Sequence, residues 1–436
     1  MIRLVLAAVF SLTALSAHAE IDIQEVTSPG GIDAWLVEEN SIPFVAIEIV
    51  IDGGASLDDP AKRGATNLMM ALLEEGSGDL TAREFQQARE GLAASYGFDA
   101  YDDSVTISAV FLTENSDEAV ALLREALINP RFDDDAIERV RAQVQSIIRS
   151  DAQDPNSIAG TAFDAAAFGD HPYGSSINGT AETVAAISRD DLLAAHRNAL
   201  VRSRVFVGAA GDISADELGV LIDGLIGDLP MDGPPIPPRV EFGLGGGTTI
   251  VPFDTPQSVA LFGHVGIERD HDDFFAAYLL NEILGGNGLE SRLMREVREE
   301  RGLTYGIYTY LVPKTSSEMY LGSVASANET IAEAIAVVRD EWALMATQGV
   351  SAQELEQAKT YLTGAYPLRF DGNAEIAGIL ASMQWTGLTP EYIINRNDFV
   401  NAVTLEEINR VASELLDPEG LHFVVVGQPV GLEASQ

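Results

Sequence analysis

The chain has 436 residues, no cysteine and a formal net charge of −41, from 67 acidic and 26 basic residues. The lack of cysteine excludes disulfides, thiolate metal sites and cysteine nucleophiles, so a transition metal would need His, Asp or Glu ligands. The acidic excess disfavours nucleic acid and anionic membranes as partners. A chain of this length with 46% hydrophobic residues should form more than one domain.

Residues 1–19 are typical of a signal peptide. Arg3 supplies the positive start, residues 4–15 form the apolar run, and residues 17–19 (AHA) provide a small-residue cleavage site. The apolar run is too short to span a bilayer as a stable helix. We therefore expect the mature chain to be periplasmic or secreted and to have no membrane span, with a retained N-terminal anchor as the weaker alternative.

The first half of the chain alternates strand and helix patterns. Residues 44–51 and 105–110 have the apolar alternation of strands, and a helix that begins near residues 58–60 should carry the apolar cluster 68–73. Thr81 can cap a further helix that bears Phe85. Residues 116–127 and 134–150 have helical spacing. This order predicts an α+β fold with helices packed on a largely antiparallel sheet.

A proline- and glycine-rich stretch, residues 229–249, divides the chain almost in half. Its first part reads LPMDGPPIPP and cannot sustain a helix or a central strand. We therefore expect an N-terminal domain over residues 20–228, a linker over 229–249 and a C-terminal domain over 250–436.

The two halves resemble each other in sequence. Five segments of the first half recur in the same order 210 to 218 residues later: 42–46 with 255–260, 69–78 with 279–288, 157–160 with 375–378, 187–192 with 403–408, and 206–211 with 423–427. Five matches in register predict an internal duplication.

Residues 283–311 carry an unusual density of arginine. Glycines 285, 286 and 288 should close one helix, and a second helix with Leu289 and Leu293 on its apolar face should end at Gly302. Residues 303–310 read as a strand. Arg298 would then lie in the last helical turn and Tyr305 at the start of the strand, where the two could donate hydrogen bonds to a peptide carbonyl or an oxyanion. The residues alone favour the alternative of a solvated charged face followed by an ordinary sheet tyrosine.

Three segments carry a resemblance to a known family. They are HPYG at residues 171–174, INGTAETVAAISRDDL at 177–192, and the ILGG and SRLMREVREERGLTY stretches within 283–305. With the duplicated halves, they resemble the pitrilysin/insulysin-type (inverzincin) metallopeptidases of the bacterial two-domain class. The mature chain is also similar to mitochondrial processing peptidase subunits and to bc1 core proteins.

The resemblance implies a zinc motif HxxEH in the first helix of the first half, and this chain departs from it. The corresponding residues are Asn67, Met70 and Ala71, in the sequence NLMMA. The third ligand should fall at residues 146–148, where no carboxylate stands. We therefore expect no metal in this chain, and no catalytic residue set of its own, although Glu74 and Glu75 lie close by.

The other part of the family's apparatus is present. Arg298 and Tyr305 have the R-x6-Y spacing that the resemblance assigns to binding of the substrate backbone. It implies a non-zinc-binding subunit of a heteromeric zinc metallopeptidase, inactive alone and paired as a heterodimer with an HxxEH-bearing homologue that holds the zinc. The alternative is a catalytically inactive pseudopeptidase that acts as a scaffold or peptide-binding protein.

The remaining motifs have weaker interpretations. His171 is expected to be structural, and His264 to be satisfied by a neighbouring group rather than to bind a metal. Residues 258–263 resemble the family's edge strand, which pairs with an extended substrate, but an ordinary core strand is an equal alternative. The glycines at 243–247 are not followed by GK[ST], so no phosphate loop is predicted.

Overall fold

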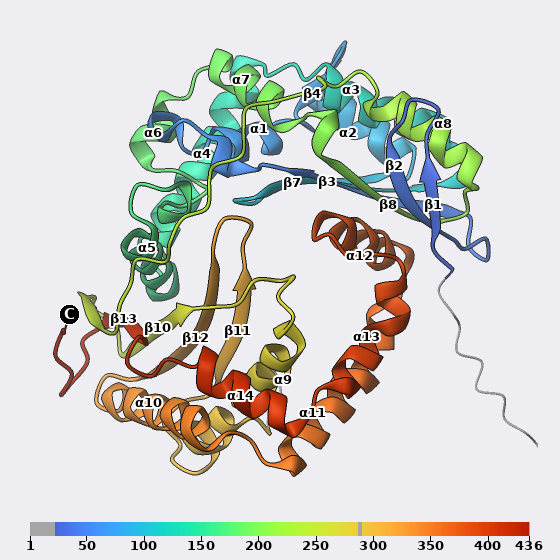
Figure 1. Ribbon diagram of the computed structural model, residues 1–436. Coiled ribbons are helices and arrows are strands. Elements are labelled where there is room, and N and C mark those ends of the chain that lie inside the picture. Colours follow the sequence, from blue (N-terminus) through green and yellow to red (C-terminus); the bar gives the residue numbers. More distant parts are fainter. Residues whose placement is uncertain (1–21, 287–289, 436) are drawn as a thin grey trace, which may run out of the picture.

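The computed structural model describes residues 22–286 and 290–435, and it shows two α+β halves that lie opposite each other (Figure 1). The expected signal peptide lies outside the described residues, as do Gly288 and Leu289. No helix in the described part of the chain is long and apolar enough to cross a bilayer.

The first half is built on a six-stranded sheet in the order β1-β2-β8-β3-β7-β6, in which only β2 and β8 pair in parallel. Its strands are β1 (Gln24–Thr27), β2 (Asp33–Glu38), β3 (Phe44–Asp52), β6 (Ser95–Ala100), β7 (Ser104–Leu112) and β8 (Val205–Gly211), and β4 (Gly76–Ser77) and β5 (Leu80–Thr81) form a small separate hairpin.

Eight α-helices accompany this sheet in the described residues. They are α1 (Ala65–Ala71), α2 (Ala82–Gly91), α3 (Ser116–Ile128), α4 (Asp134–Asp151), α5 (Pro155–Phe168), α6 (Ala181–Ala186), α7 (Arg189–Ala199) and α8 (Ala215–Ile226). The predicted cap of α2 is confirmed, because Thr81 and Glu84 form a reciprocal capping box. The helix expected near residues 58–60 is split, since a 3-10 turn (Pro60–Lys62) precedes α1.

The second half is built on a five-stranded sheet in the order β11-β12-β10-β13-β9, in which β13 and β9 are parallel. Its strands are β9 (Gly247–Pro252), β10 (Gln257–Val265), β11 (Ile307–Pro313), β12 (Glu318–Ala327) and β13 (His422–Gly427). Its helices are α9 (Phe274–Gly285), the π-helical turn η6 (Met294–Glu299), α10 (Ile331–Gln348), α11 (Ala352–Ala365), α12 (Asn373–Trp385), α13 (Glu391–Ala402) and α14 (Leu405–Leu415).

The two sheets share one topology. The order β2-β8-β3-β7-β6 of the first half corresponds strand for strand to β9-β13-β10-β12-β11, and the single parallel pair occupies the same place in each. The matched sequence segments fall on equivalent elements, so that α7 and α14 both begin with a capping box after a Ser or Thr. The α+β class and the duplication are therefore confirmed.

Each half lends one helix to the sheet of the other half. Helix α12 packs on β8 and β3 of the first sheet, and α5 packs on β10 and β13 of the second (Figure 1). Trp385 of α12 donates its indole N–H to Asp52 over 3.1 Å, and Gln384 donates to the Val207 carbonyl over 2.7 Å. We call the sheet face that the exchanged helix covers the inner face.

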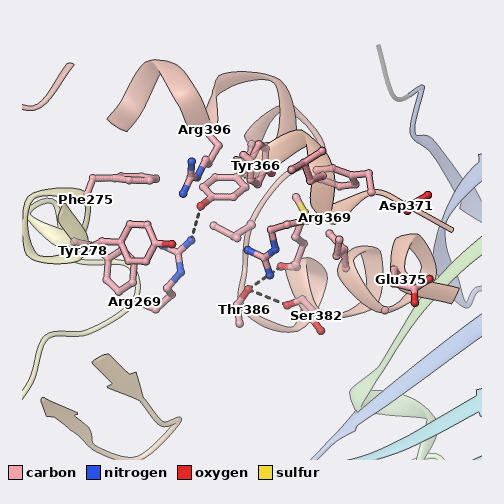
Figure 2. Close-up of a pocket in the computed structure, with 18 residues that line it drawn as sticks. Arg269, Phe275, Tyr278, Tyr366, Arg369, Asp371, Glu375, Ser382, Thr386 and Arg396 are labelled. Carbon is pink, nitrogen blue, oxygen red and sulfur yellow. Dashed lines mark hydrogen bonds between the residues drawn. The ribbon is translucent and has the colours of Figure 1, made fainter. Parts of the chain in front are cut away.

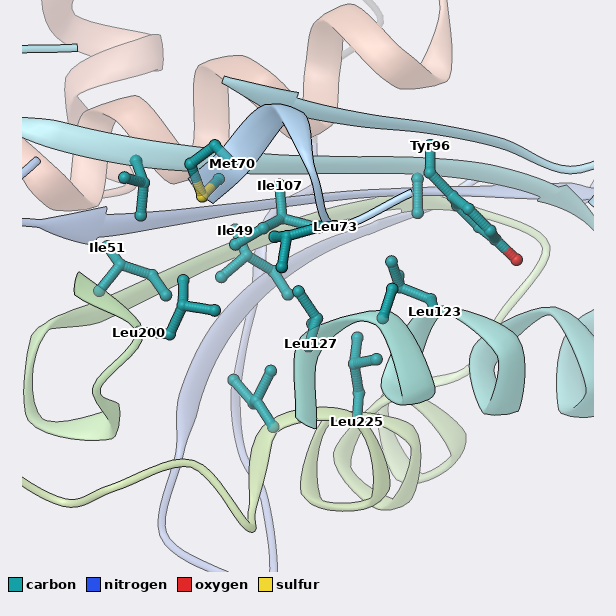
Figure 3. Packing of buried hydrophobic residues seen from close by; sticks show 14 of the residues in the cluster. Ile49, Ile51, Met70, Leu73, Tyr96, Ile107, Leu123, Leu127, Leu200 and Leu225 are labelled. Carbon is teal, nitrogen blue, oxygen red and sulfur yellow. The ribbon is translucent and has the colours of Figure 1, made fainter. Parts of the chain in front are cut away.

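The opposite face of the first sheet is its main apolar core. Alternation along β3 places Val45, Ile47, Ile49 and Ile51 in that core, together with side chains from α1, α3 and α8 (Figure 3). The intervening Glu48 therefore faces the inner side.

Residues 227–246 contain no helix or strand, and they join α8 to β9. The segment is packed rather than free, because Phe242 lies between the rings of Phe163 and Phe168 with centroids 5.9 and 6.1 Å away. Val240 also donates its backbone N–H to Ser316 over 2.9 Å.

One sequence expectation is wrong, and a choice that the sequence left open is decided in favour of a core strand. The strand expected over residues 303–310 begins only at Ile307, so Tyr305 precedes it. The strand at 258–263 is not an edge strand, because β10 pairs with β12 on one side and with β13 on the other. The edges of the two sheets on the equivalent side are instead β6 and β11.

Candidate functional site

The first part of the site is helix α1, where the resemblance placed a zinc motif. Asn67 is half-buried and donates its side-chain N–H to Asn178 over 2.9 Å. Asn178 in turn reaches the Asp151 carboxylate over 3.5 Å. These contacts give Asn67 a structural role, since they tie α1 to the end of α4 and to the loop after the HPYG motif.

Met70 and Ala71 complete the departure from a metal site. Met70 is 1% exposed and belongs to the main core beside Ile49 and Leu73 (Figure 3), and Ala71 is an exposed methyl group. At the position of the expected third ligand, α4 presents residues 146–148, a serine and two isoleucines. None of these positions carries a carboxylate or an imidazole.

These residues do not fit zinc. An amide and a methyl group stand where the motif has its two imidazole ligands, and a buried thioether stands where it has the carboxylate that activates the water. Within residues 22–286 and 290–435, no group of three His, Asp or Glu side chains could hold a metal ion. Nearby Glu74 and Glu75 are ion-paired instead, to Arg89 over 2.6 Å and to Arg139 over 2.5 Å.

The second part of the site is the arginine-rich segment after α9. The structure places Arg298 in η6, a π-helical turn in which the Glu300 N–H reaches back to the Arg295 carbonyl over 2.9 Å. Gly302 ends this turn with a φ of 63°, a left-handed conformation that favours glycine. Turns of the π type are rare and often mark functional positions.

Three of the four arginines of this segment have ion-pair partners. Arg292 is 9% exposed and binds Glu354 at the start of α11 through two bonds of 2.7 and 2.9 Å. Hydrogen bonds from Arg292 and Ser351 outweigh burial and hold the pKa of Glu354 at about 2. Arg301 and Arg295 both bind Glu296, over 2.8 and 3.4 Å.

Arg298 differs from these three. Its side chain is exposed and has no hydrogen bond or ion pair with any residue the structure describes. The backbone that carries it is nevertheless fixed, because Gly302 and Leu303 donate to the carbonyls of Arg298 and Val297 over 3.0 and 2.9 Å. A charged group with free donors therefore stands on a rigid turn.

Tyr305 stands on an equally rigid turn. Its side chain is 87% exposed. The flanking Thr304 hydroxyl lies 2.7 Å from the Ala325 carbonyl and accepts from the Gly306 N–H over 3.1 Å, and Ser326 donates to the Leu303 carbonyl over 2.5 Å. The backbone at Tyr305 is therefore held in place while its hydroxyl is open to solvent.

The sequence patterns did not single out a group of residues on the inner faces. Tyr308 and Tyr310 lie on the inner side of edge strand β11 and are 45% and 42% exposed. On the inner side of β3, burial and then the charge of Asp99 raise the pKa of Glu48 to about 7. Asp164 of α5 is also desolvated, which raises its pKa to about 6. These groups lie on the inner faces only because strands and helices that are distant in sequence pack together.

The HPYG motif joins the two halves. Tyr173 is 1% exposed, and its hydroxyl donates to Asp103 over 2.5 Å while it accepts the Ser316 N–H over 3.0 Å. Asp103 also accepts the Thr315 N–H, so the loop binds both the β6–β7 turn and the β11–β12 turn. Beside it, Lys314 forms a 2.6 Å ion pair with Asp102. The relative position of the halves is thereby fixed at this corner.

The histidines behave as structural groups. His171 accepts the Tyr173 N–H over 3.3 Å and packs edge-on against the Tyr173 ring. His264 is 4% exposed, accepts the indole N–H of Trp342 over 3.0 Å and binds the Val265 carbonyl over 2.6 Å. The expectation that a neighbour satisfies His264 is confirmed.

The chain folds into two duplicated α+β domains that exchange one helix each. The first domain has the helix in which the resemblance placed a zinc motif, and the second has an arginine-rich turn. Together these features define a two-domain peptidase-like protein. Family models agree with this class. The model described as Insulinase (Peptidase family M16) matches residues 35–181, and the one described as Peptidase M16 inactive domain matches residues 186–362. The chain belongs to the M16 (insulinase/pitrilysin) peptidase family.

Individual relatives span nearly the whole chain. It is similar to a Helicobacter pylori protein named non-peptidase homolog YmxG, with 26% identity over 90% of this chain and 91% of the relative. A Bacillus subtilis protein named uncharacterized zinc protease YmxG is 25% identical over 90% and 95% of the two chains. Among solved structures, a Pseudomonas fluorescens chain described as peptidase M16 inactive domain has a TM-score of 0.88 and 26% identity, and covers 95% of this chain and 100% of its own length.

Proposed function

We propose that this chain is the zinc-free subunit of a two-chain M16 peptidase. A homologous partner with an intact HxxEH motif would hold the zinc and perform the hydrolysis. This chain would contribute Arg298 and Tyr305, which bind the backbone of the peptide substrate and orient it. From residues 1–19 we further infer that the complex acts after export, in the periplasm or outside the cell.

The observation that supports the proposal most strongly is that Arg298 is exposed and has no carboxylate partner among the described residues. In a chain with 67 acidic residues, an exposed arginine beside Glu299 and Glu300 has no described carboxylate partner, whereas Arg292, Arg295 and Arg301 all have one. A guanidinium offers several N–H donors and a phenol one O–H donor, which suit a peptide carbonyl or a developing oxyanion. Donors held in place before the substrate arrives need little reorganisation during the reaction.

A second candidate function is a pseudopeptidase that acts as a scaffold or a peptide-binding protein. It is favoured by the Asn67–Asn178–Asp151 contacts, which give a structural use to the position where the resemblance implies a zinc ligand. The name non-peptidase homolog, given to the H. pylori relative, is also consistent with it. The two functions differ in whether a zinc-bearing partner becomes active with this chain.

Co-expression distinguishes them. This chain would be produced with an HxxEH-bearing homologue from the same genome, and the pair and each chain alone would be assayed for zinc and for cleavage of a mixed peptide library. The proposal expects a stable complex with about one zinc per pair, and turnover that neither chain shows alone. A partner that is fully active alone, or that forms no complex, would refute the subunit role and leave the scaffold.

A further inference from the structure

A cavity of about 690 Å³ lies in the second half, between the start of α9, residues 366–371, α12 and α13 (Figure 2). This volume is typical of small-ligand sites. The cavity is separate from the Arg298 and Tyr305 turn, since neither residue lines it.

Three arginines from three different segments surround this cavity. Arg269 precedes α9, Arg369 follows α11 and Arg396 belongs to α13. None of them forms an ion pair with a carboxylate in the described part of the chain. Acidic residues outnumber basic ones by 67 to 26 in the whole chain, whereas three arginines face two acidic side chains in this lining, so the cavity is locally basic.

Aromatic rings hold two of these arginines in place. The Arg269 guanidinium lies 4.3 Å from the Phe274 ring centroid and donates to the Tyr392 hydroxyl over 3.0 Å. Arg396 is 5% exposed, and its guanidinium lies 4.6 Å from the Tyr366 ring centroid. Stacking of this kind fixes a guanidinium and leaves its edge N–H groups available.

Arg396 has donors to spare. Its Nη1 donates to the Leu362 carbonyl over 2.8 Å and to Asn397 over 3.1 Å. Its Nε and Nη2 have no partner among the described residues, and they are not sealed away from space that a ligand or water can enter. A buried arginine with open donors favours an anion that can accept two parallel hydrogen bonds, as a carboxylate does.

The rest of the lining restricts the ligand further. Phe275, Ile379, Met383 and Leu388 make much of the wall apolar, which suits an aliphatic or aromatic group beside the anion. Asp371 and Glu375 stand at the end away from Arg269 (Figure 2). They would repel a ligand with several negative charges, such as a nucleotide.

We propose that this cavity binds a carboxylate attached to an apolar or aromatic group, the chemistry of a peptide's C-terminal residue and also of a fatty acid. The guanidinium groups of Arg269 and Arg396 bind the carboxylate, and the apolar wall receives the attached group. The site does not depend on the role of Arg298 or on a partner subunit.

Calorimetric titration of the mature chain tests the proposal. N-acetylphenylalanine would be compared with its amide, and Ala-Ala-Phe and decanoate would then identify the source of the carboxylate. We expect the acid to bind with a Kd between about 10 μM and 1 mM, at least ten times more tightly than the amide. Tighter binding of the tripeptide would assign a peptide end, and tighter binding of decanoate a fatty acid.

Variants locate the site. Arg269→Gln and Arg396→Gln should each weaken binding of the acid at least tenfold, while Arg197→Gln, at an exposed position on α7, should not change it. Thermal unfolding would check that Arg396→Gln still folds, and Arg269→Gln keeps the test valid if it does not. Equal affinity for acid and amide, no binding of either, or unchanged binding in a folded Arg269→Gln variant would overturn the proposal.

Discussion

The two halves share one topology, yet the segment that resembles the peptidase apparatus is used in opposite ways in each half. In the first half, Met70 is buried in the core and Asn67 is hydrogen-bonded to Asn178. In the second half, Arg298 and Tyr305 stand exposed on hydrogen-bonded turns. Buried and satisfied side chains indicate a structural role, whereas exposed donors on a rigid backbone are typical of a binding surface.

The largest effect should come from an attempt to restore the motif in the first half. The triple variant Asn67→His, Met70→Glu, Ala71→His places a carboxylate where the native side chain is 1% exposed. We expect a loss of at least about 3 kcal/mol in the free energy of unfolding, because that charge has no partner in the core. Denaturant unfolding and zinc analysis would measure this.

The double variant Asn67→His, Ala71→His is the matched control, since it leaves the core intact. It should fold and bind zinc only weakly, because residues 146–148 supply no third ligand. A triple variant with native stability and one tightly bound zinc would contradict the view that the first half has lost its site.

The exchange of helices between the halves gives the next largest effect. A Cβ at Gly208 would lie 2.1 Å from the carbonyl oxygen of Ala377 in α12, so Gly208→Ala must push α12 from the first sheet. We expect a loss of about 3 kcal/mol in the free energy of unfolding. The control Gly160→Ala on α5 meets nothing within 4 Å and should stabilise the protein by up to about 1 kcal/mol. Equal effects of the two would show that close packing of α12 is unimportant.

Glu48 gives a smaller and pH-dependent effect. Its native pKa of about 7 exceeds the ordinary value of 4.5, because the carboxyl is half-buried near Asp99. Between these two values the native state keeps the proton and the unfolded chain releases it, so this group lowers stability as the pH rises from about 4.5 to about 7. Glu48→Gln should therefore raise the free energy of unfolding by about 2 kcal/mol at pH 8 and by little at pH 4. An equal gain at both pH values would assign the effect to packing instead.

Much of the fold followed from local patterns. The capping box at Thr81, the alternation along β3 and the repeated segments predicted elements and duplication, because each depends on neighbours in sequence or on a simple period. The exchange of α5 and α12 was not predictable, since nothing local in these helices shows which sheet they cover. The same holds for β10, whose two partners are set by strands from distant parts of the chain.

The candidate site divides in the same way. The departure of Asn67, Met70 and Ala71 from the zinc motif is visible in the sequence, and the structure adds what these side chains do instead. The R-x6-Y spacing singles out Arg298 among the four arginines of its segment, and the structure adds that the other three have ion-pair partners whereas Arg298 has none among the described residues. The π-helical turn at η6 and the arginines around the α9–α13 cavity depend on tertiary packing, so no sequence period reveals them.

In the proposed function, the second half of this chain positions the substrate of a zinc-bearing partner. Its most direct test is kcat of the reconstituted complex with Arg298→Ala, Tyr305→Phe and the matched control Arg295→Ala, which removes a neighbouring arginine that is ion-paired. We predict that kcat falls about 100-fold and about 10-fold for the first two, and less than about twofold for the control, with assembly unchanged in all three. Unchanged kcat in Arg298→Ala and Tyr305→Phe would contradict the account.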